Sequence, residues 1–141
     1  MASLADIRTA LATRITTGTG LRTLPEARDQ ISPPVAIILP GQPVVQYGAT
    51  MDGTFLVNLR VLVAISDAPP NEKVQRALDA YLGIGASSSS GSSIAGAIQQ
   101  DPTLGGAVHF AEAMSAGSYG RISYNDITYF GARIDVQIGA I

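Results

Sequence analysis

The sequence predicts an α+β fold, in which a largely antiparallel or mixed β-sheet has helices packed on one face. Three observations lead to this prediction. Apolar side chains occupy alternate positions from Thr54 to Ile65, as they do on one face of a β-strand. Two further segments, near the N-terminus and after residue 70, carry apolar residues at helical spacing. The order of elements, a helix, several strands, two helices and more strands, is typical of an α+β domain.

The first predicted element is a helix from Ser3 to about Gly18. Ser3 belongs to the residue types that cap helix N-termini, and apolar residues then recur at helical spacing at Leu4, Ile7, Leu11 and Ile15. A short alternating strand is expected from Leu21 to Leu24. The prolines at positions 25, 33 and 34 exclude both a helix and a central strand from the connector that follows.

Three strands are expected next. The first spans Val35 to Leu39 and ends at Pro40, the second is a short edge piece at residues 43–47, and the third is the central strand from Thr54 to Ile65. One face of this central strand is wholly apolar, with Phe55, Val57, Leu59, Val61, Val63 and Ile65. Its other face is mixed, which suits partial cover by a helix or a neighbouring subunit.

Two helices should follow the central strand. The first carries an apolar stripe at helical spacing, formed by Val74, Ala77, Leu78, Tyr81 and Leu82. Residues Gly83 to Ser93 read GIGASSSSGSS, a composition that cannot pack a core, so we expect a flexible loop at 83–93. Ser93 also caps a short helix at residues 94–100, which is closed by Asp101 and Pro102.

The chain then returns to strands. One strand is predicted from Ala107 to about Met114, and the glycines at 117 and 120 break it. A closing hairpin turns around Asn125 and Asp126. In its last strand, which should pair near the central strand, one face looks inward and the other outward. The inward residues are Phe130, Ala132, Ile134, Val136 and Ile138, and the outward ones are Tyr129, Arg133, Asp135 and Gln137.

Length and composition indicate a single domain covering residues 1–141. Charged residues make up only 14% of the chain, against about a quarter in an ordinary domain, which suggests buried subunit contacts. A net charge of -2 and a single lysine, Lys73, argue against a phosphate-neutralising surface, so we expect no general electrostatic attraction to DNA. No apolar run reaches the roughly 20 residues of a membrane-spanning helix, so we expect no membrane partner.

No reaction chemistry or cofactor is indicated, and we expect no enzyme. The chain has no cysteine, and its one histidine, His109, has no clustered carboxylates for a metal site. The glycines of the serine-rich loop lack the Gly-Lys-Ser/Thr ending of a phosphate cradle. Residues 113–117, AMSAG, are one residue away from a nucleophile elbow, yet no helix follows them. Glu112 has no identifiable partner for acid catalysis.

Several phrases of the chain together resemble the tail terminator proteins of long-tailed siphophages, particularly those of actinobacterial hosts. They are LADIRTALATRI, GLRTLPEARDQISPPVAIILPG, LRVLVAISDAPPNEKVQRALDAYLG, SIAGAIQQDPTLGG and SYGRISYNDITYFGARIDVQI. The likeness covers nearly the whole chain and rests on element order, length and phrases such as the apolar strand followed by an aspartate. It includes no invariant motif.

The resemblance implies a virion protein, assembled in the host cytoplasm, whose subunits form a hexameric ring at the head-proximal end of the tail. Such a ring caps the major tail tube protein, stops tube polymerisation and docks to the head-tail connector. DNA passes through its lumen without specific binding. The family offers no catalytic residues to transfer to this chain.

Arg60, Arg133 and Asp135 are the candidate residues for fixing the register between subunits. They stand among apolar neighbours on outward strand faces, although a merely solvated face is an equally good interpretation of each. Two alternatives to a tail terminator stay open. One is a head-completion or neck adaptor protein of the same kind of phage, and the other is a small ligand-binding or enzymatic α+β domain.

Overall fold

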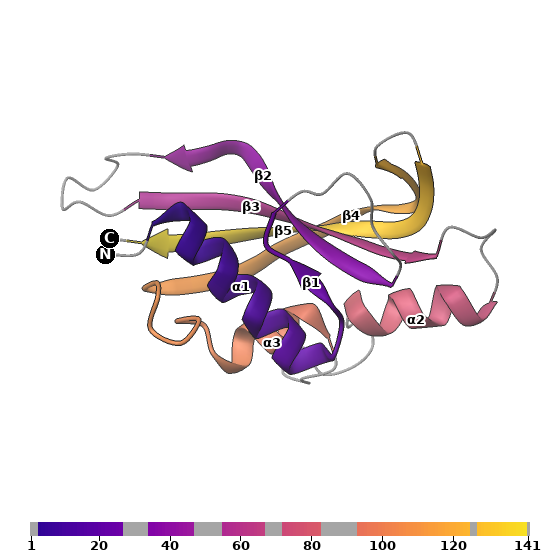
Figure 1. Cartoon of the computed structure of the whole chain (residues 1–141), viewed down its shortest axis with the longest axis horizontal. Coiled ribbons are helices and arrows are strands. Elements are labelled where there is room, and N and C mark those ends of the chain that lie inside the picture. Colours follow the sequence, from indigo (N-terminus) through magenta and orange to yellow (C-terminus); the bar gives the residue numbers. More distant parts are fainter. Residues whose placement is uncertain are drawn as a thin grey trace.

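Five strands form one sheet in the order β1-β2-β3-β5-β4, in the computed structural model of the chain (Figure 1). The structure describes residues 3–26, 34–46, 55–66, 72–82, 93–124 and 127–140. The elements are α1 (Leu4–Thr19), β1 (Thr23–Leu24), β2 (Val35–Gln46), β3 (Phe55–Ser66), α2 (Glu72–Leu82), α3 (Ile94–Gln100), β4 (Phe110–Tyr124) and β5 (Ile127–Ala140). Only the short β1–β2 pairing is parallel, so the sheet is largely antiparallel, as predicted.

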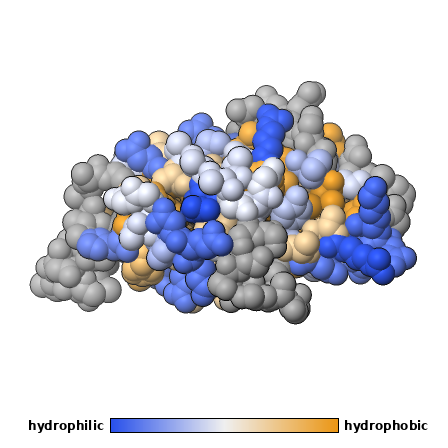
Figure 2. Space-filling model, turned by 90° about the horizontal axis from the view of Figure 1, so that it is seen from below, coloured by the Kyte–Doolittle hydropathy of each residue, from blue (hydrophilic) through white to orange (hydrophobic). Residues whose placement is uncertain are grey.

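The helices pack on one face of this sheet, which confirms the predicted α+β architecture. The main core joins the buried residues of α1, α2 and α3 to one face of β3 and β5. In Figure 1 α2 and α3 lie below the strands, and α1 runs diagonally across the left part of the sheet towards α3. The outer side of this helical layer is largely hydrophilic, with apolar side chains showing towards the right of Figure 2.

β3 is the central strand, as its sequence predicts. It lies between β2 and β5. On its apolar face Val57, Leu59, Val61 and Val63 are buried, whereas Phe55 and Ile65 at its two ends are only partly buried. The apolar side chains of β5 that were predicted to face inward, from Phe130 to Ile138, are buried in the same core. Alternation in the two strands therefore determines which face receives the helices.

Both predicted caps of the helices are present. The Ser3 hydroxyl accepts a hydrogen bond from the Asp6 backbone N–H, and the Asp6 carboxylate accepts one from the Ser3 N–H, both at 3.1 Å. α1 ends at Thr19, one residue beyond its predicted end near Gly18, and the next residue, Gly20, adopts the left-handed conformation. Ser93 is fully buried and caps α3 through the Gly96 N–H at 2.9 Å. The rest of the predicted 83–93 loop lies outside the described residues.

β2 is longer than predicted. The expected break at Pro40 is wrong, because the strand continues from Val35 to Gln46. A register shift between Pro40 and Val45 absorbs the extra residues, so that the two predicted pieces form one bulged strand. Gly41 sits in this bulge so close to Asn58 that a side chain there would collide with the β3 backbone.

β4 also differs from the prediction. Instead of a strand that stops near Met114 and a separate piece before the hairpin, it is one strand from Phe110 to Tyr124. Two register shifts interrupt its pairing with β5, between Ala113 and Ser115 and between Gly117 and Gly120. In the second, Ser118 has a φ of 54°. The glycines therefore form a bulge and do not end the strand.

Tyr129 is the residue of β5 whose environment was predicted wrongly. It was expected on an outward surface, yet only 3% of it is exposed. It belongs to a second apolar cluster on the face opposite the helices, formed by Leu24, Val35, Ile37, Ala64 and Tyr129. Ile122 and Tyr124 of the β4–β5 hairpin pack against this cluster, and the hairpin curves upward at the right of Figure 1. One end of that face is therefore closed.

Candidate functional site

The candidate site lies on the face of the sheet opposite the helices, which we call the open face. Residues paired across neighbouring strands share a face. Arg60 of β3 pairs with Asp135 of β5, and Asp135 pairs with Ser115 of β4. Arg133, two residues before Asp135, points to the same side. The structure thus brings all three residues predicted from the sequence together on one surface.

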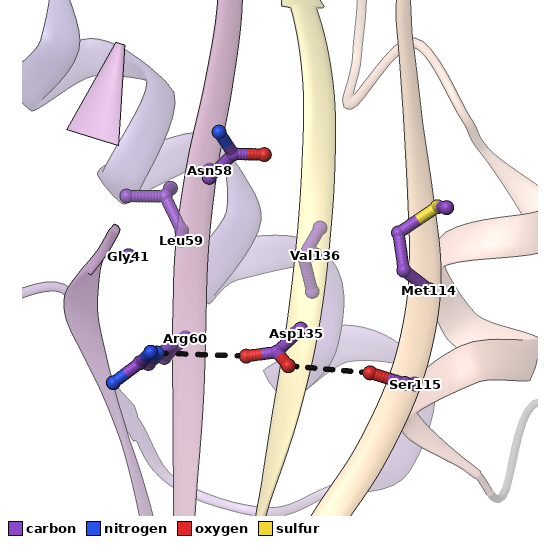
Figure 3. A pocket seen from close by; sticks show the side chains of 8 residues that line it. All are labelled: Gly41, Asn58, Leu59, Arg60, Met114, Ser115, Asp135 and Val136. Carbon is purple, nitrogen blue, oxygen red and sulfur yellow. Dashed lines mark hydrogen bonds and ion pairs between the residues drawn. The ribbon is translucent and has the colours of Figure 1, made fainter. Parts of the chain in front are cut away.

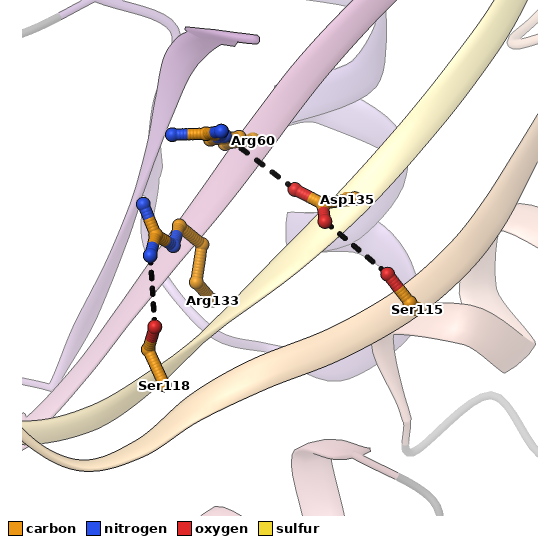
Figure 4. Close-up of polar contacts among 5 residues, drawn as sticks. All are labelled: Arg60, Ser115, Ser118, Arg133 and Asp135. Atoms are coloured by element: carbon orange, nitrogen blue, oxygen red, sulfur yellow. Dashed lines mark hydrogen bonds and ion pairs between the residues drawn. The ribbon is translucent and has the colours of Figure 1, made fainter. Parts of the chain in front are cut away.

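Arg60, Asp135 and Ser115 form a polar row across three strands. The Arg60 Nε lies 3.6 Å from the Asp135 Oδ1, and the Ser115 hydroxyl donates a hydrogen bond to the Asp135 Oδ2 at 3.2 Å. Figure 4 shows this row, in which each oxygen of the Asp135 carboxylate faces a different strand. The aspartate therefore joins the central strand to the edge strand.

Arg133 has a separate partner. Its Nη2 donates a hydrogen bond to the Ser118 hydroxyl at 2.8 Å, below the first row in Figure 4. Ser118 is the residue of the β4 bulge with positive φ. A non-glycine residue in this conformation is uncommon, and bulges often redirect side chains at functional surfaces. The bulge thus places a hydroxyl where Arg133 can reach it.

A shallow pocket of about 240 Å³ lies beside the polar row. Arg60, Asp135 and Ser115 line one side of it, and the Asn58 and Met114 side chains lie on β3 and β4 further along the groove (Figure 3). Met114 is 55% exposed, which is the largest exposure among the large apolar residues of the described part. The open face is thus a polar surface with an exposed apolar side chain at its rim.

The ion pair of the polar row contributes little free energy within the subunit. The Arg60 side chain is 34% exposed and that of Asp135 is 54% exposed, so water screens the ion pair. Such pairs contribute about 0–1 kcal/mol. A side chain that is already paired and only weakly held can exchange its partner when another surface approaches. The chemistry of the row is therefore suited to recognition between polar surfaces.

The structure does not place Ser115 in a nucleophile elbow. It lies inside β4, whereas an elbow needs a sharp turn from a strand into a helix. His109 is six residues away along an extended chain, about 20 Å by the rise of a strand. Within the described residues, no three histidine, cysteine or acidic side chains gather as a metal site.

Two residues of this region were missed by the sequence reasoning. Ser115 was considered only as part of a possible nucleophile elbow and Ser118 only as part of a strand break, because the bulges that orient them follow from strand register. Tyr119 lies on the helix side of the sheet, where its hydroxyl donates a 2.8 Å hydrogen bond to Asp79 of α2. Its ring also meets that of Phe130 edge-on, with centroids 5.6 Å apart. Burial, and then the bond to Asp79, raise the pKa of Tyr119.

Comparisons with protein families and with curated proteins identify no relative of the chain. No protein-family model matches the chain, and no curated protein sequence matches it significantly. Among the described helices, none is long and apolar enough to cross a membrane.

Proposed function

We propose that the protein is a phage tail terminator: a structural subunit that forms a closed ring, most simply of six copies, on the tail tube. The ring ends tube polymerisation and docks the tail to the connector of the head. The observation that carries this proposal is the gathering of Arg60, Asp135 and Arg133 on the sheet face that no described helix covers. The resemblance of the sequence, stated above, supports the same proposal.

The architecture is compatible with a ring subunit. A closed ring requires a heterologous contact, in which one surface of a subunit meets a different surface of the next. This molecule has two dissimilar faces: the helices pack on one (Figure 1), and the other carries the polar row beside the second apolar cluster. Low overall charge also fits a subunit that loses much of its surface to neighbours. DNA would pass through the lumen without base-specific contacts.

Electron microscopy of phage particles that lack this gene tests the proposal. A missing terminator leaves tails of uncontrolled length or tails that are not joined to heads. Complementation with the wild-type gene must restore both length and joining. If the particles instead have tails of normal length and only the junction fails, the protein is a neck adaptor. Normal particles would exclude both assignments and favour a ligand-binding or enzymatic domain.

A further inference from the structure

The outer edge of β4 is a second surface of interest, apart from the open face. β4 ends the five-stranded sheet, and in the described part of the chain no strand pairs with its outer side. An edge strand presents a row of backbone N–H and C=O groups to any strand that approaches. Natural edges are usually protected by prolines, charges or bulges. The two bulges of β4 lie beyond Ala113, and the stretch Phe110–Ala113 before them has no proline and only Glu112 as a charged residue.

The opposite edge of the sheet is better protected. β1 covers β2 only at Ala36 and Ile37. Beyond that point β2 contains Pro40 and Pro43, which have no N–H to offer to another strand. The two edges therefore differ, and β4 is the one that can accept a strand.

A pocket of about 280 Å³ lies directly beside this edge, between α3 and the first half of β4. Its apolar lining consists of Ala95, Ile98, Pro102, Ala111 and Ala113. For scale, an engineered apolar cavity of about 150 Å³ takes up benzene. The pocket therefore has room for at least one aliphatic side chain, and it is bordered by the regular stretch of β4 before its first bulge.

We propose that β4 and this pocket form a strand-addition site, called here the edge groove, for an extended segment of a partner protein. The backbone of the segment would pair with Phe110–Ala113. In such sites main-chain hydrogen bonds supply affinity, and pockets for alternate side chains supply specificity. This inference does not depend on the ring proposal.

The residues of the groove define the chemistry of the segment. Ala111 is buried and Ala113 partly buried on the helix side of β4, whereas Glu112 is exposed on the other side. Cross-strand neighbours share a face. The partner residues opposite Ala111 and Ala113 therefore enter the pocket and should be aliphatic. The residue between them lies opposite the Glu112 carboxylate and should be basic. The expected order of residues in the partner segment is thus apolar, basic, apolar.

A second copy of β4 does not meet these requirements. The residues that it would bring to the pocket are again Ala111 and Ala113, whose methyl groups leave most of the space unfilled. An antiparallel pair of β4 strands would also add no basic residue opposite Glu112 in the regular stretch, which reads FAEA. A second β4 is therefore a poor occupant, and the proposal assigns the edge groove to an extended segment of another protein.

A labelled synthetic peptide tests the proposal by fluorescence anisotropy. The probe is a nonapeptide with alternating threonine and aliphatic residues and a central Leu-Lys-Leu, and its control has N-methyl groups on all three central residues, because only alternate residues of an added strand turn their N–H towards β4. Only the first should bind, because N-methylation removes backbone donors. Ala95→Trp fills the pocket from α3 and should weaken binding about tenfold or more, the effect of losing a central anchor. Ala80→Trp, on the exposed side of α2, is the matched control and should change nothing.

Charge reversal provides a second, independent readout. Glu112→Lys should weaken the Leu-Lys-Leu peptide by up to about fivefold and strengthen a Leu-Glu-Leu peptide correspondingly, the range of an exposed ion pair. If Ala95→Trp fails to fold, Gln99→Trp at an exposed position of the same pocket replaces it. Equal binding of the methylated peptide, or full binding by both pocket variants, would overturn the proposal. So would a dimer in light scattering that Ala95→Trp dissociates, because the occupant would then be a second copy.

Discussion

At the scale of single residues, Gly131 is a point of close approach between β5 and the central strand. A Cβ atom at this position would overlap the Val63 carbonyl oxygen, which belongs to the backbone of β3. Backbone atoms of a paired strand cannot move aside as a flexible side chain can. The absence of a side chain at Gly131 is therefore a requirement of strand pairing.

We expect Gly131→Ala to lower the free energy of unfolding by about 3 kcal/mol or more, at the upper end for overpacked sites. Gly117→Ala is the control, because no atom lies within 4 Å of a Cβ built there and its φ is not in the left-handed region. That variant should be neutral or stabilising by up to about 1 kcal/mol. Urea unfolding of both variants measures the difference. Equal stabilities would show that β5 does not approach β3 in this way.

Tyr119 gives a prediction for alkaline pH. Its pKa is raised above the ordinary 10.0 by burial and then by the hydrogen bond to Asp79. The folded protein thus holds the phenol proton more tightly than the unfolded chain does. The resulting stability is fully present below the unfolded pKa and is lost as pH rises through the folded pKa. Solvent reaches the ring, which is 43% exposed, so the effect is modest.

Tyr119→Phe should therefore remove part of the loss of stability above about pH 10. The measurement is the free energy of unfolding of wild type and variant from about pH 8 to pH 11. The difference between them should be constant at the lower pH values and shrink at the higher ones. Parallel curves over the whole range would contradict the assignment of Tyr119 as the titrating group.

At the scale of elements, β3 determines the fold. Val61 is fully buried on its helix-facing side, in the strand that has paired neighbours on both sides. We expect Val61→Asp to prevent folding, since an unpaired charge in a core costs several kcal/mol. Ser123→Asp, at an exposed position of β4, is the control. Soluble expression and thermal unfolding distinguish the two, and a normally melting Val61→Asp protein would show that this face is not the core.

In the segment before α3, we expect Ser93 to contribute to stability and the serines from 87 to 90 to contribute little. The buried Ser93 hydroxyl caps α3, so Ser93→Ala should cost about 1–2 kcal/mol. Removing Ser87 to Ser90 should cost much less, because serine and glycine repeats supply neither a core nor regular hydrogen bonds. Thermal unfolding of the two variants compares them directly. A larger loss after the deletion than after Ser93→Ala would contradict this division.

The elements that followed a regular pattern were predictable, and those that depend on register were not. The alternation of apolar side chains predicted β3 and β5, and the serines at positions 3 and 93 predicted the caps of α1 and α3. Pro40 and the glycines of β4 were interpreted as strand ends, because local preferences do not reveal that a partner strand can accommodate a bulge. The Arg60–Asp135 pair needed the register of β3 against β5, and the burial of Tyr129 needed the position of the hairpin.

At the scale of the whole molecule, the two faces of the sheet differ in what they contain. The helix side holds the core, and the second cluster closes one end of the open face. What remains in the middle is the polar row with Arg133, whose partners all lie in the same subunit. A neighbour in the proposed ring would thus meet a surface whose charges are already oriented. In this arrangement the charges could fix the register between neighbouring subunits, and none of them would be unpaired in the free subunit.

Exchanging the two charges of the row separates its role within the subunit from its role between subunits. Arg60→Asp alone places two carboxylates side by side, and Asp135→Arg alone places two guanidinium groups together, so each should destabilise the subunit by up to about 1 kcal/mol. The double variant restores the ion pair and should restore thermal stability.

Ring assembly should respond differently. In the double variant the positive and negative charges have exchanged places, so a neighbouring subunit would meet the wrong charge at each position. We therefore expect the double variant not to restore ring assembly or tail length in particles. Arg121→Asp, at an exposed position of β4, changes the net charge as much as Arg60→Asp alone does and should assemble normally. The measurement is the symmetry and position of the subunit density in intact tails together with the distribution of tail lengths. Normal rings from the double variant would show that the pair acts only inside the subunit, and density that is not a closed ring coaxial with the tube would end the tail terminator proposal.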